Sequence, residues 1–293
     1  MKTIEEMDNS MMEDYRRCPK YFQYRHVDYL SYIDMSSTCK PEFGSALHDG
    51  LESWYTHHDP ALMDKAFVDR YAEYEGADLS GIRSLGKGLI IMAKYREWFP
   101  DEPFDVLELE IGGSVDMGKF LFIFRCDGLI QNKQTGALNI FEHKTSAHKG
   151  FLITKPNHQL CGYTFGVREL MGAEVTGALF NIIYFRKGRK NEDQRDTITF
   201  NREETLRSKE ELQLWRKEVS WVAHQIQASC KYDFFPRNTK GCTTMGGCQY
   251  LELCRLPEGP MRDSVKNTLF EVQPWEPFTG ARDLDQEKID NAS

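Results

Sequence analysis

The sequence predicts an α/β protein with a mixed central sheet flanked by helices. Three observations support this fold class. The first hundred residues have apolar side chains at helical spacing, residues 104–146 alternate with period two, and the rest alternates helices with strands. Runs of strands and helices in one chain of 293 residues favour a single large α/β core.

The N-terminal region is expected to be helical. Ser10 and Glu13 have the spacing of a capping box, which predicts a helix start, and Pro19 should end or kink that helix. Three more helices are expected at residues 45–58, 60–75 and 83–98.

Strand patterns follow at residues 104–115, 119–132 and 136–146, joined by short turns. A helix is expected at 157–171, then strands at 177–185 and 196–200 and a long helix at 202–229.

Bulk composition narrows the class of protein. No apolar run reaches the ~20 residues of a membrane helix, and the N-terminus lacks the apolar stretch of a secretory signal. We therefore expect no membrane partner and a cytoplasmic location, in a bacterium or in its host if the chain is phage-encoded. A net charge of −8 argues against a protein that coats nucleic acid, but not against an enzyme that acts on it.

Charged residues end the strand "NIFEHKTS" at residues 139–146. Residues two apart share a face of a strand, so Glu142 and Lys144 project together and His143 points away. If the hairpin folds about Gln134 and Thr135, paired residue numbers sum to 269 and Asp127 lies opposite Glu142.

Such a cluster suits metal-assisted hydrolysis. Two close carboxylates repel each other unless a cation lies between them, and Mg²⁺ or Mn²⁺ takes such oxygen ligands. The ammonium of Lys144 could hold the attacking water and offset charge on a phosphate. Taken alone, Glu142 and Lys144 would also fit a solvated surface hairpin.

Other side chains could complete the site. Gln159 and Tyr163 lie four apart on one face of the next predicted helix. His48 could supply a nitrogen ligand, which would favour Mn²⁺. Glu110 is a further acidic candidate, which the pattern does not separate from Glu108 on the same face.

These motifs together resemble the PD-(D/E)XK nuclease superfamily, in its RecB-like branch. "FGSALHDGLE" resembles the upstream Gly-x-x-x-His motif, and "QLCGY" the downstream Gln-x-x-x-Tyr motif. The resemblance covers about residues 10–255. Cys126 stands before the aspartate, where this branch often has glycine.

The resemblance implies a restriction-endonuclease-like core and assigns roles. His48, Asp127, Glu142 and the backbone carbonyl of His143 would bind Mg²⁺ or Mn²⁺. Lys144 would be catalytic, and Gln159 and Tyr163 would support the site.

The implied activity is that of a DNA exonuclease acting on DNA that is single-stranded or has single-stranded ends, in recombination, repair or end processing. A helicase or recombination protein would be a partner. The alternative is a non-catalytic DNA-binding or scaffold subunit that retains the fold.

Three cysteines near the C-terminus form a second constellation. Cys242, Cys248 and Cys254 have the spacing Cys-x5-Cys-x5-Cys, which lacks the fourth ligand of a tetrahedral site. By resemblance to the iron–sulfur RecB-type nucleases, Cys18 is the fourth ligand of a [4Fe–4S] cluster. Zinc, three free thiols, and Cys230 as the fourth ligand remain alternatives. Cys39, Cys126 and Cys161 are expected to be ordinary buried thiols.

The expected organisation is one nuclease domain over residues 1–257. It comprises a helical part at about 10–100, a catalytic core at about 104–229, and a cysteine region at 230–257 joined to Cys18. Residues 258–293 would form an extension with a partly loose tail. "GIRSLGKGL" at 81–89 resembles a phosphate-binding loop, but Gly88 stands where Ser or Thr would hold Mg²⁺. We interpret it as a helix-capping loop and expect no nucleoside triphosphate to bind.

Overall fold

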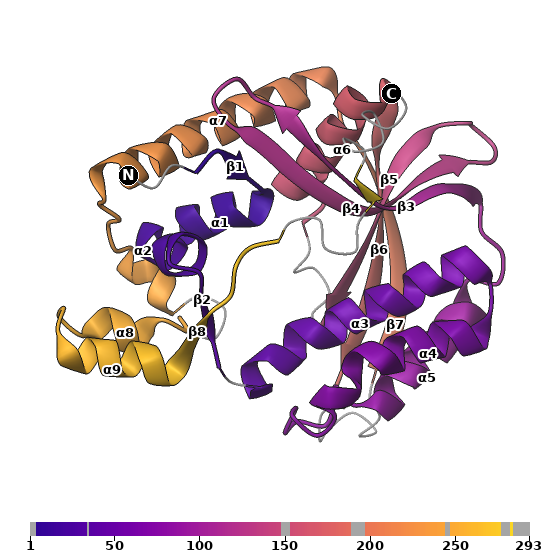
Figure 1. Cartoon of the computed structure of the whole chain (residues 1–293). Coiled ribbons are helices and arrows are strands. Elements are labelled where there is room, and N and C mark those ends of the chain that lie inside the picture. Colours follow the sequence, from indigo (N-terminus) through magenta and orange to yellow (C-terminus); the bar gives the residue numbers. More distant parts are fainter. Residues whose placement is uncertain are drawn as a thin grey trace, which may run out of the picture. The chain divides into compact units, whose positions relative to one another are not determined.

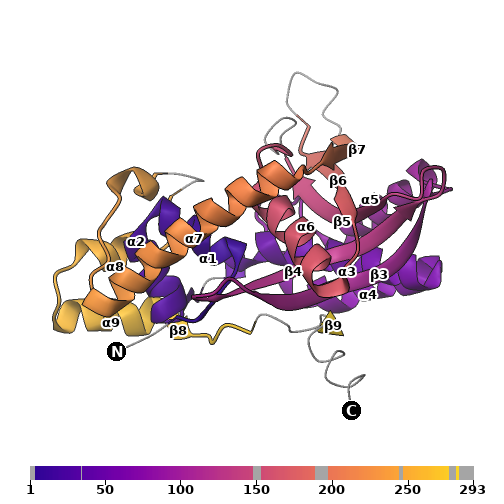
Figure 2. The same ribbon diagram turned by 90° about the horizontal axis from the view of Figure 1, so that it is seen from above.

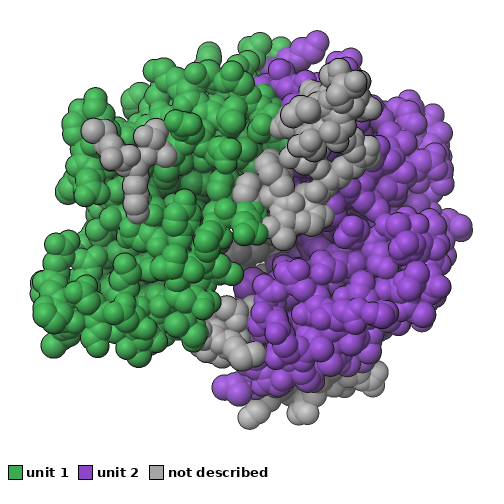
Figure 3. All heavy atoms as spheres, in the orientation of Figure 1, with its two compact units in different colours: residues 1–34, 113–124, 210–279 green, residues 35–112, 125–209, 280–293 purple. Residues whose placement is uncertain are grey.

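A computed structural model of the chain describes residues 4–33, 35–147, 153–188, 197–243, 247–276 and 282–283. The chain divides into two compact units. Unit 1 contains residues 1–34, 113–124 and 210–279, and unit 2 contains residues 35–112, 125–209 and 280–293; Figure 3 colours them separately. The expected single-domain organisation stays a prediction.

A mixed sheet of seven strands confirms the predicted α/β class, with the strand order β7-β6-β5-β4-β3-β9 and β1 paired with β4. The strands are β1 (Glu6–Met7), β3 (Phe104–Asp116), β4 (Leu121–Asn132), β5 (Leu138–Ser146), β6 (Val175–Arg186), β7 (Thr197–Leu206) and β9 (Arg282–Asp283). β4 pairs antiparallel with β5, and β5 pairs parallel with β6.

Helices cover the sheet within unit 2. They are α3 (Met35–His57), α4 (Pro60–Tyr71), α5 (Leu85–Trp98) and α6 (His158–Met171), with a 3₁₀ turn η2 (Ala72–Tyr74) after α4. Figures 1 and 2 show α3, α4 and α5 grouped on one side of the sheet and α6 against β5 and β6 on the other. A single apolar cluster, which includes Phe43, Phe67, Tyr95, Phe141 and Phe185, joins α3, α4 and α5 to the sheet.

Unit 1 is built from segments that are far apart in the sequence. Its helical elements are α1 (Asn9–Arg17), α2 (Pro19–Phe22), the π-helical turn η1 (Gln23–Val27), most of α7 (Lys209–Tyr232), η3 (Thr239–Cys242), α8 (Leu251–Arg255) and α9 (Pro260–Leu269). The short strands β2 (Leu30–Tyr32) and β8 (Phe270–Val272) pair antiparallel. An apolar cluster that includes Tyr21, Tyr24, Leu30, Tyr250 and Phe270 packs these segments together.

Several predicted boundaries were wrong. Asp8, not Ser10, caps α1, because its carboxylate accepts the backbone N–H of Met11 at 2.7 Å. The helix does end before Pro19, as predicted. The second helix begins about ten residues early, at Met35, and runs through Pro41.

The segment 202–206, expected to start a helix, extends β7 instead. Its ladder with β6 runs continuously from Arg186↔Thr197 to Gly177↔Leu206, so sheet pairing overrides the helix propensity of this charged stretch. Within the expected C-terminal extension, residues 260–272 form α9 and β8. The expected loose tail, the last dozen residues, lies outside the described residues except for 282–283 and stays a prediction.

Two further expectations concern loops and membranes. The segment 81–89 caps a helix as predicted, because the hydroxyl of Ser84 accepts the backbone N–H of Lys87 at the start of α5. Within the described part of the chain, no helix is both long and apolar enough to cross a membrane.

Candidate active site

The β4–β5 hairpin has the predicted register. Pairs from Gln131↔Leu138 to Gly128↔Phe141 all have numbers that sum to 269. At the next position along β4, the side chain of Asp127 bonds to β5: its Oδ2 accepts the backbone N–H of His143 at 2.6 Å. Gly128 permits this geometry, since a Cβ there would lie 2.9 Å from the backbone oxygen of Glu108 on β3.

Glu142 and Lys144 project to the same side of β5. The Lys144 Nζ donates to Glu142 Oε1 at 2.6 Å, and the Glu142 side chain is 2% exposed. Its second oxygen, Oε2, is buried without a hydrogen-bond donor among the described residues. Burial and the nearby Asp127 carboxylate raise the pKa of Glu142 to about 7. Lys144 thus satisfies one oxygen of this buried carboxylate and leaves the other without a partner.

His48 brings α3 to the end of the hairpin. Its Nδ1 lies 3.2 Å from Oδ1 of Asp127. Burial alone would lower the pKa of His48, but the charge and hydrogen bond of Asp127 outweigh it and raise that pKa. Burial would conversely raise the pKa of Asp127, yet His48 holds it well below its usual range. Asp127 is thus the anionic centre of the cluster.

The structure separates Glu110 from Glu108. Burial, followed by the Asp127 charge, raises the pKa of Glu110 to about 8, which places this carboxyl within electrostatic reach of Asp127. Glu110 also has a φ of 47°, in the left-handed region that few residues other than glycine adopt inside a strand. This backbone conformation sets Glu110 apart from Glu108, and the carboxylate of Glu110 also forms an ion pair with Arg125 at 3.5 Å.

The helix after the hairpin contributes the predicted pair. Asn157 caps α6 by accepting the backbone N–H of Leu160 at 2.9 Å. Within α6, Gln159 Nε2 donates to the hydroxyl of Tyr163, one turn later, at 2.7 Å. Burial, with further contributions from Glu142 and Asp127, raises the pKa of Tyr163 well above its usual value. The neutral phenol therefore lies near the two carboxylates.

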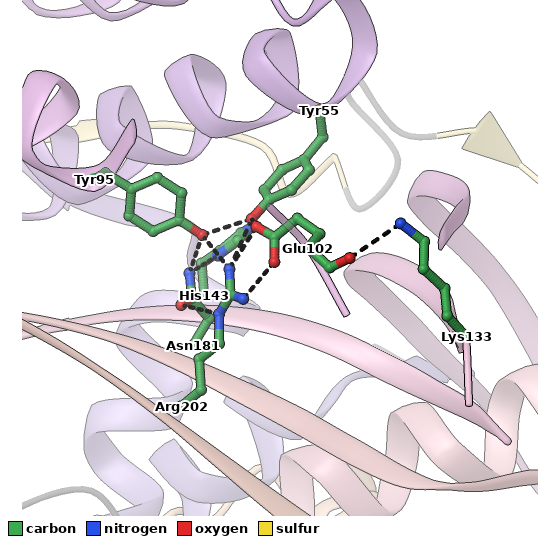
Figure 4. Close-up of polar contacts among 7 residues, drawn as sticks. All are labelled: Tyr55, Tyr95, Glu102, Lys133, His143, Asn181 and Arg202. Carbon is green, nitrogen blue, oxygen red and sulfur yellow. Dashed lines mark hydrogen bonds and ion pairs between the residues drawn. The ribbon is translucent and has the colours of Figure 1, made fainter. Parts of the chain in front are cut away.

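His143 points into a buried polar network that the sequence did not reveal (Figure 4). Its Nδ1 accepts a hydrogen bond from Asn181 Nδ2 at 2.7 Å, and the same amide nitrogen lies 2.9 Å from the Tyr95 hydroxyl. Burial lowers the pKa of His143 to about 3, so the imidazole is neutral. The His143 side chain, which strand alternation predicts to point away from Glu142, is therefore anchored on the opposite side of β5.

Arg202 on β7 completes that network (Figure 4). Its guanidinium donates to both carboxylate oxygens of Glu102, at 2.5 and 2.7 Å, and to Oδ1 of Asn181 at 3.2 Å. It also reaches the hydroxyls of Tyr55 and Tyr95, each at 3.1 Å. The network's members are scattered from Tyr55 to Arg202, so no local motif could have identified them.

The donor set fits a hard divalent cation, although no described group of three or more His, Cys, Asp or Glu side chains stands close enough to hold a metal ion as arranged. The fit rests on the buried Oε2 of Glu142 and on the raised pKa values of Glu142 and Glu110 beside Asp127. A cation among these oxygens would give Oε2 of Glu142 a positively charged partner and would lower the pKa values of Glu142 and Glu110.

The four cysteines of the second predicted site line one small pocket in unit 1. Cys18, Cys242, Cys248 and Cys254 all contribute to its wall. The backbone N–H of Asn238 donates to the Cys18 sulfur at 3.3 Å, the kind of hydrogen bond that stabilises a metal-bound thiolate. Cys230, the rival fourth ligand, is buried and does not line the pocket.

Comparisons with known proteins agree with the fold. Residues 9–255 match the family model of the PD-(D/E)XK nuclease superfamily. A crystal structure from Eubacterium rectale, named a candidate exonuclease, aligns with 87% of this chain and 90% of its own, at 13% identity and a TM-score of 0.51. A second structure, SSO0001, covers 88% of this chain and 90% of its own at 14% identity, but its TM-score of 0.35 bears no weight. No curated protein matches the sequence.

Proposed function

Because the chain belongs to the PD-(D/E)XK nuclease superfamily, we propose that it is a metal-dependent deoxyribonuclease that hydrolyses phosphodiester bonds at DNA ends. The observation that carries the proposal is the cluster of Asp127, Glu142 and Lys144 at the end of the β4–β5 hairpin, with one buried carboxylate oxygen lacking a donor. A subunit without catalysis has no need of such an unfavourable arrangement.

His48, Asp127, Glu142 and the backbone carbonyl of His143 would hold Mg²⁺ or Mn²⁺, with Glu110 as a further contributor. Lewis acidity towards water and phosphate oxygens is the chemistry that the ion supplies when bound.

The protein's own groups would position the reactants. Lys144 lies on the same side of β5 as Glu142, where its ammonium would orient the attacking water and offset charge that develops on the phosphate. The hydrogen-bonded pair of Gln159 and Tyr163 presents a neutral amide and phenol beside the carboxylates, which would orient the scissile strand without adding negative charge.

The substrate would be DNA that is single-stranded or carries single-stranded ends, and the role would be recombination, repair or end processing, in a bacterium or a phage. These finer statements rest on the motif resemblance. A helicase or recombination partner would supply strand separation.

Lys144→Ala tests the catalytic assignment. With Mg²⁺ or Mn²⁺ titrated against end-labelled DNA, cleavage should be lost, whereas binding of the same DNA in EDTA should persist. Lys133→Ala, in the exposed turn of the hairpin, is the matched control and should cleave like the wild type. Undiminished cleavage by Lys144→Ala would refute the assignment, and a wild type that binds DNA but cleaves none would indicate a scaffold subunit instead.

The four cysteine thiols around the unit 1 pocket are proposed to bind a [4Fe–4S] cluster with a structural role. Support comes from their shared pocket and from four thiolates being the usual ligand set of such clusters. Protein purified without oxygen should be brown and contain about four irons per chain. Zinc without iron would replace the proposal with a zinc site.

A further inference from the structure

Within unit 1, the C-terminal part of α7 lies beside α1 and α2 (Figure 1). Residues of these helices and of the segment after α7 line an open groove of about 500 Å³. Tyr15 and Ser229 lie at its floor and are joined by a hydrogen bond of 2.7 Å between their hydroxyls. Pro19 and Pro236 also line it. We call this feature the α7 groove.

Two aromatic side chains of the α7 groove face solvent. Tyr232 is 73% exposed and Phe234 is 68% exposed, although large aromatic side chains are ordinarily well buried. Lys231 Nζ lies 5.6 Å from the centre of the Tyr232 ring. Two exposed aromatic rings thus border the groove, and a cation lies over one of them.

The backbone fixes these rings in place. The N–H of Phe234 bonds to the carbonyl of Ser229 at 3.0 Å and that of Asp233 to Cys230 at 3.3 Å, the hydrogen-bond pattern of a Schellman cap. Asp233 adopts the left-handed conformation of that cap at a φ of 49° without being glycine. Phe235 is buried and stacks on Phe22, at 6.4 Å between ring centres, which anchors the segment. The exposed rings therefore project from a held backbone.

The segments around the groove are basic. Residues 13–25 contain four basic and two acidic side chains, and residues 231–240 contain three basic and one acidic. The two segments lie side by side, since the backbone N–H of Lys20 donates to the carbonyl of Pro236 at 3.3 Å. Together they have a net charge of +4 in a chain whose net charge is −8. Of these side chains, Arg16 lines the groove, and Arg17, Lys20 and Arg237 line the neighbouring cysteine pocket. Positive charge gathered in this part of an acidic protein favours an anionic partner.

We propose that the α7 groove binds unpaired bases of single-stranded DNA, with Tyr232 and Phe234 as stacking platforms and the surrounding basic residues as phosphate contacts. Aromatic planes combined with positive charge are the features by which proteins hold single strands without reading sequence. Duplex DNA would gain only the phosphate contacts, because its bases are already stacked on one another. The choice of DNA rests on the proposed nuclease function, but the groove is distinct from the carboxylate cluster, which lies in unit 2.

Fluorescence anisotropy in EDTA tests the proposal, with a labelled oligothymidylate of about 20 nucleotides and a duplex of matched length. Tyr232→Ala/Phe234→Ala should bind the single strand about tenfold more weakly or worse, with duplex binding unchanged. Tyr232→Phe/Phe234→Tyr should retain the affinity. Trp221→Ala is the matched control, since Trp221 is 66% exposed on the same helix and does not line the groove.

Single-strand affinity that survives Tyr232→Ala/Phe234→Ala would overturn the proposal, as would an equal loss of duplex binding. Hydrolysis of bis(p-nitrophenyl) phosphate with Mn²⁺ reports on the carboxylate cluster alone, because this substrate has no bases, and should be unchanged in the double variant. If the double substitution weakens single-strand binding but the wild type hydrolyses no ester, the nuclease function fails while the groove assignment stands. If the wild type hydrolyses the ester but binds no single strand, the groove assignment fails while the nuclease function stands.

Discussion

Replacing Arg202 with methionine should destabilise unit 2 by about 3–5 kcal/mol, the cost of leaving one charge of a buried pair without its partner. The guanidinium makes five hydrogen bonds, of which two go to Glu102, and it lies 3.5 Å from the centre of the Phe99 ring. The Arg202 and Glu102 side chains are only 12% and 15% exposed. Water can therefore do little to solvate the carboxylate that remains.

The second substitution distinguishes a lost attraction from a stranded charge. Arg202→Met/Glu102→Leu removes both charges and should recover most of the lost stability, because apolar replacement of a buried pair is often close to neutral. Lys65→Met is the surface control. Lys65 pairs with Asp69 on α4, but both side chains are more than half exposed, so its loss should cost about 1 kcal/mol or less.

Urea unfolding followed by hydrogen exchange of the β6 and β7 amides is the suitable assay, because it reports on unit 2 itself. The reasoning is refuted if Arg202→Met costs no more than Lys65→Met. It is equally refuted if the double variant is as unstable as Arg202→Met, since the damage would then come from lost packing rather than from the unpaired charge.

Two further outcomes follow from the site and the sheet. Glu142 and Glu110 have pKa values raised to about 7 and about 8, so these carboxyls hold protons that a metal ion must displace. Mn²⁺ affinity should therefore rise as the pH increases from 6 to 8, and binding should release protons. Calorimetry in buffers of different ionisation enthalpy measures this release, and its absence would contradict the prediction. Gly177→Ala should destabilise the protein by about 1–3 kcal/mol, because the added Cβ would lie 2.0 Å from a backbone oxygen of β7. Gly86→Ala, in the first turn of α5, is the control: its Cβ would meet nothing within 4 Å, so this change should be neutral or stabilising. Equal melting temperatures for the two variants would contradict the predicted clash at Gly177.

The sequence was informative wherever chemistry is local. Turn residues Gln134 and Thr135 fixed the hairpin register, and period-two alternation placed Glu142 beside Lys144 and away from His143. Local signals also misled. Ser10 and Glu13 had capping-box spacing, but Asp8 was two residues earlier and took the role.

What the sequence could not provide depends on contacts between distant segments. Residues 202–206 favour a helix by composition, and only the edge of β6 makes them a strand. The network behind His143 joins side chains from α3, α5, β6 and β7, whose proximity exists only after the sheet has formed. Glu108 and Glu110 became distinguishable through the backbone conformation of one residue.

The discontinuity of unit 1 has a consequence during synthesis. Unit 2 is nearly complete once residue 209 has been made, but unit 1 needs residues from the first helix to beyond residue 270. Cys18 leaves the ribosome 224 residues before Cys242, an interval of roughly 10–45 s at about 5–20 residues per second. The pocket lined by the four cysteines therefore cannot form until Cys254 has been synthesised. A chain truncated before Cys242 would carry Cys18 as a thiol without any of the three cysteines that line the pocket with it.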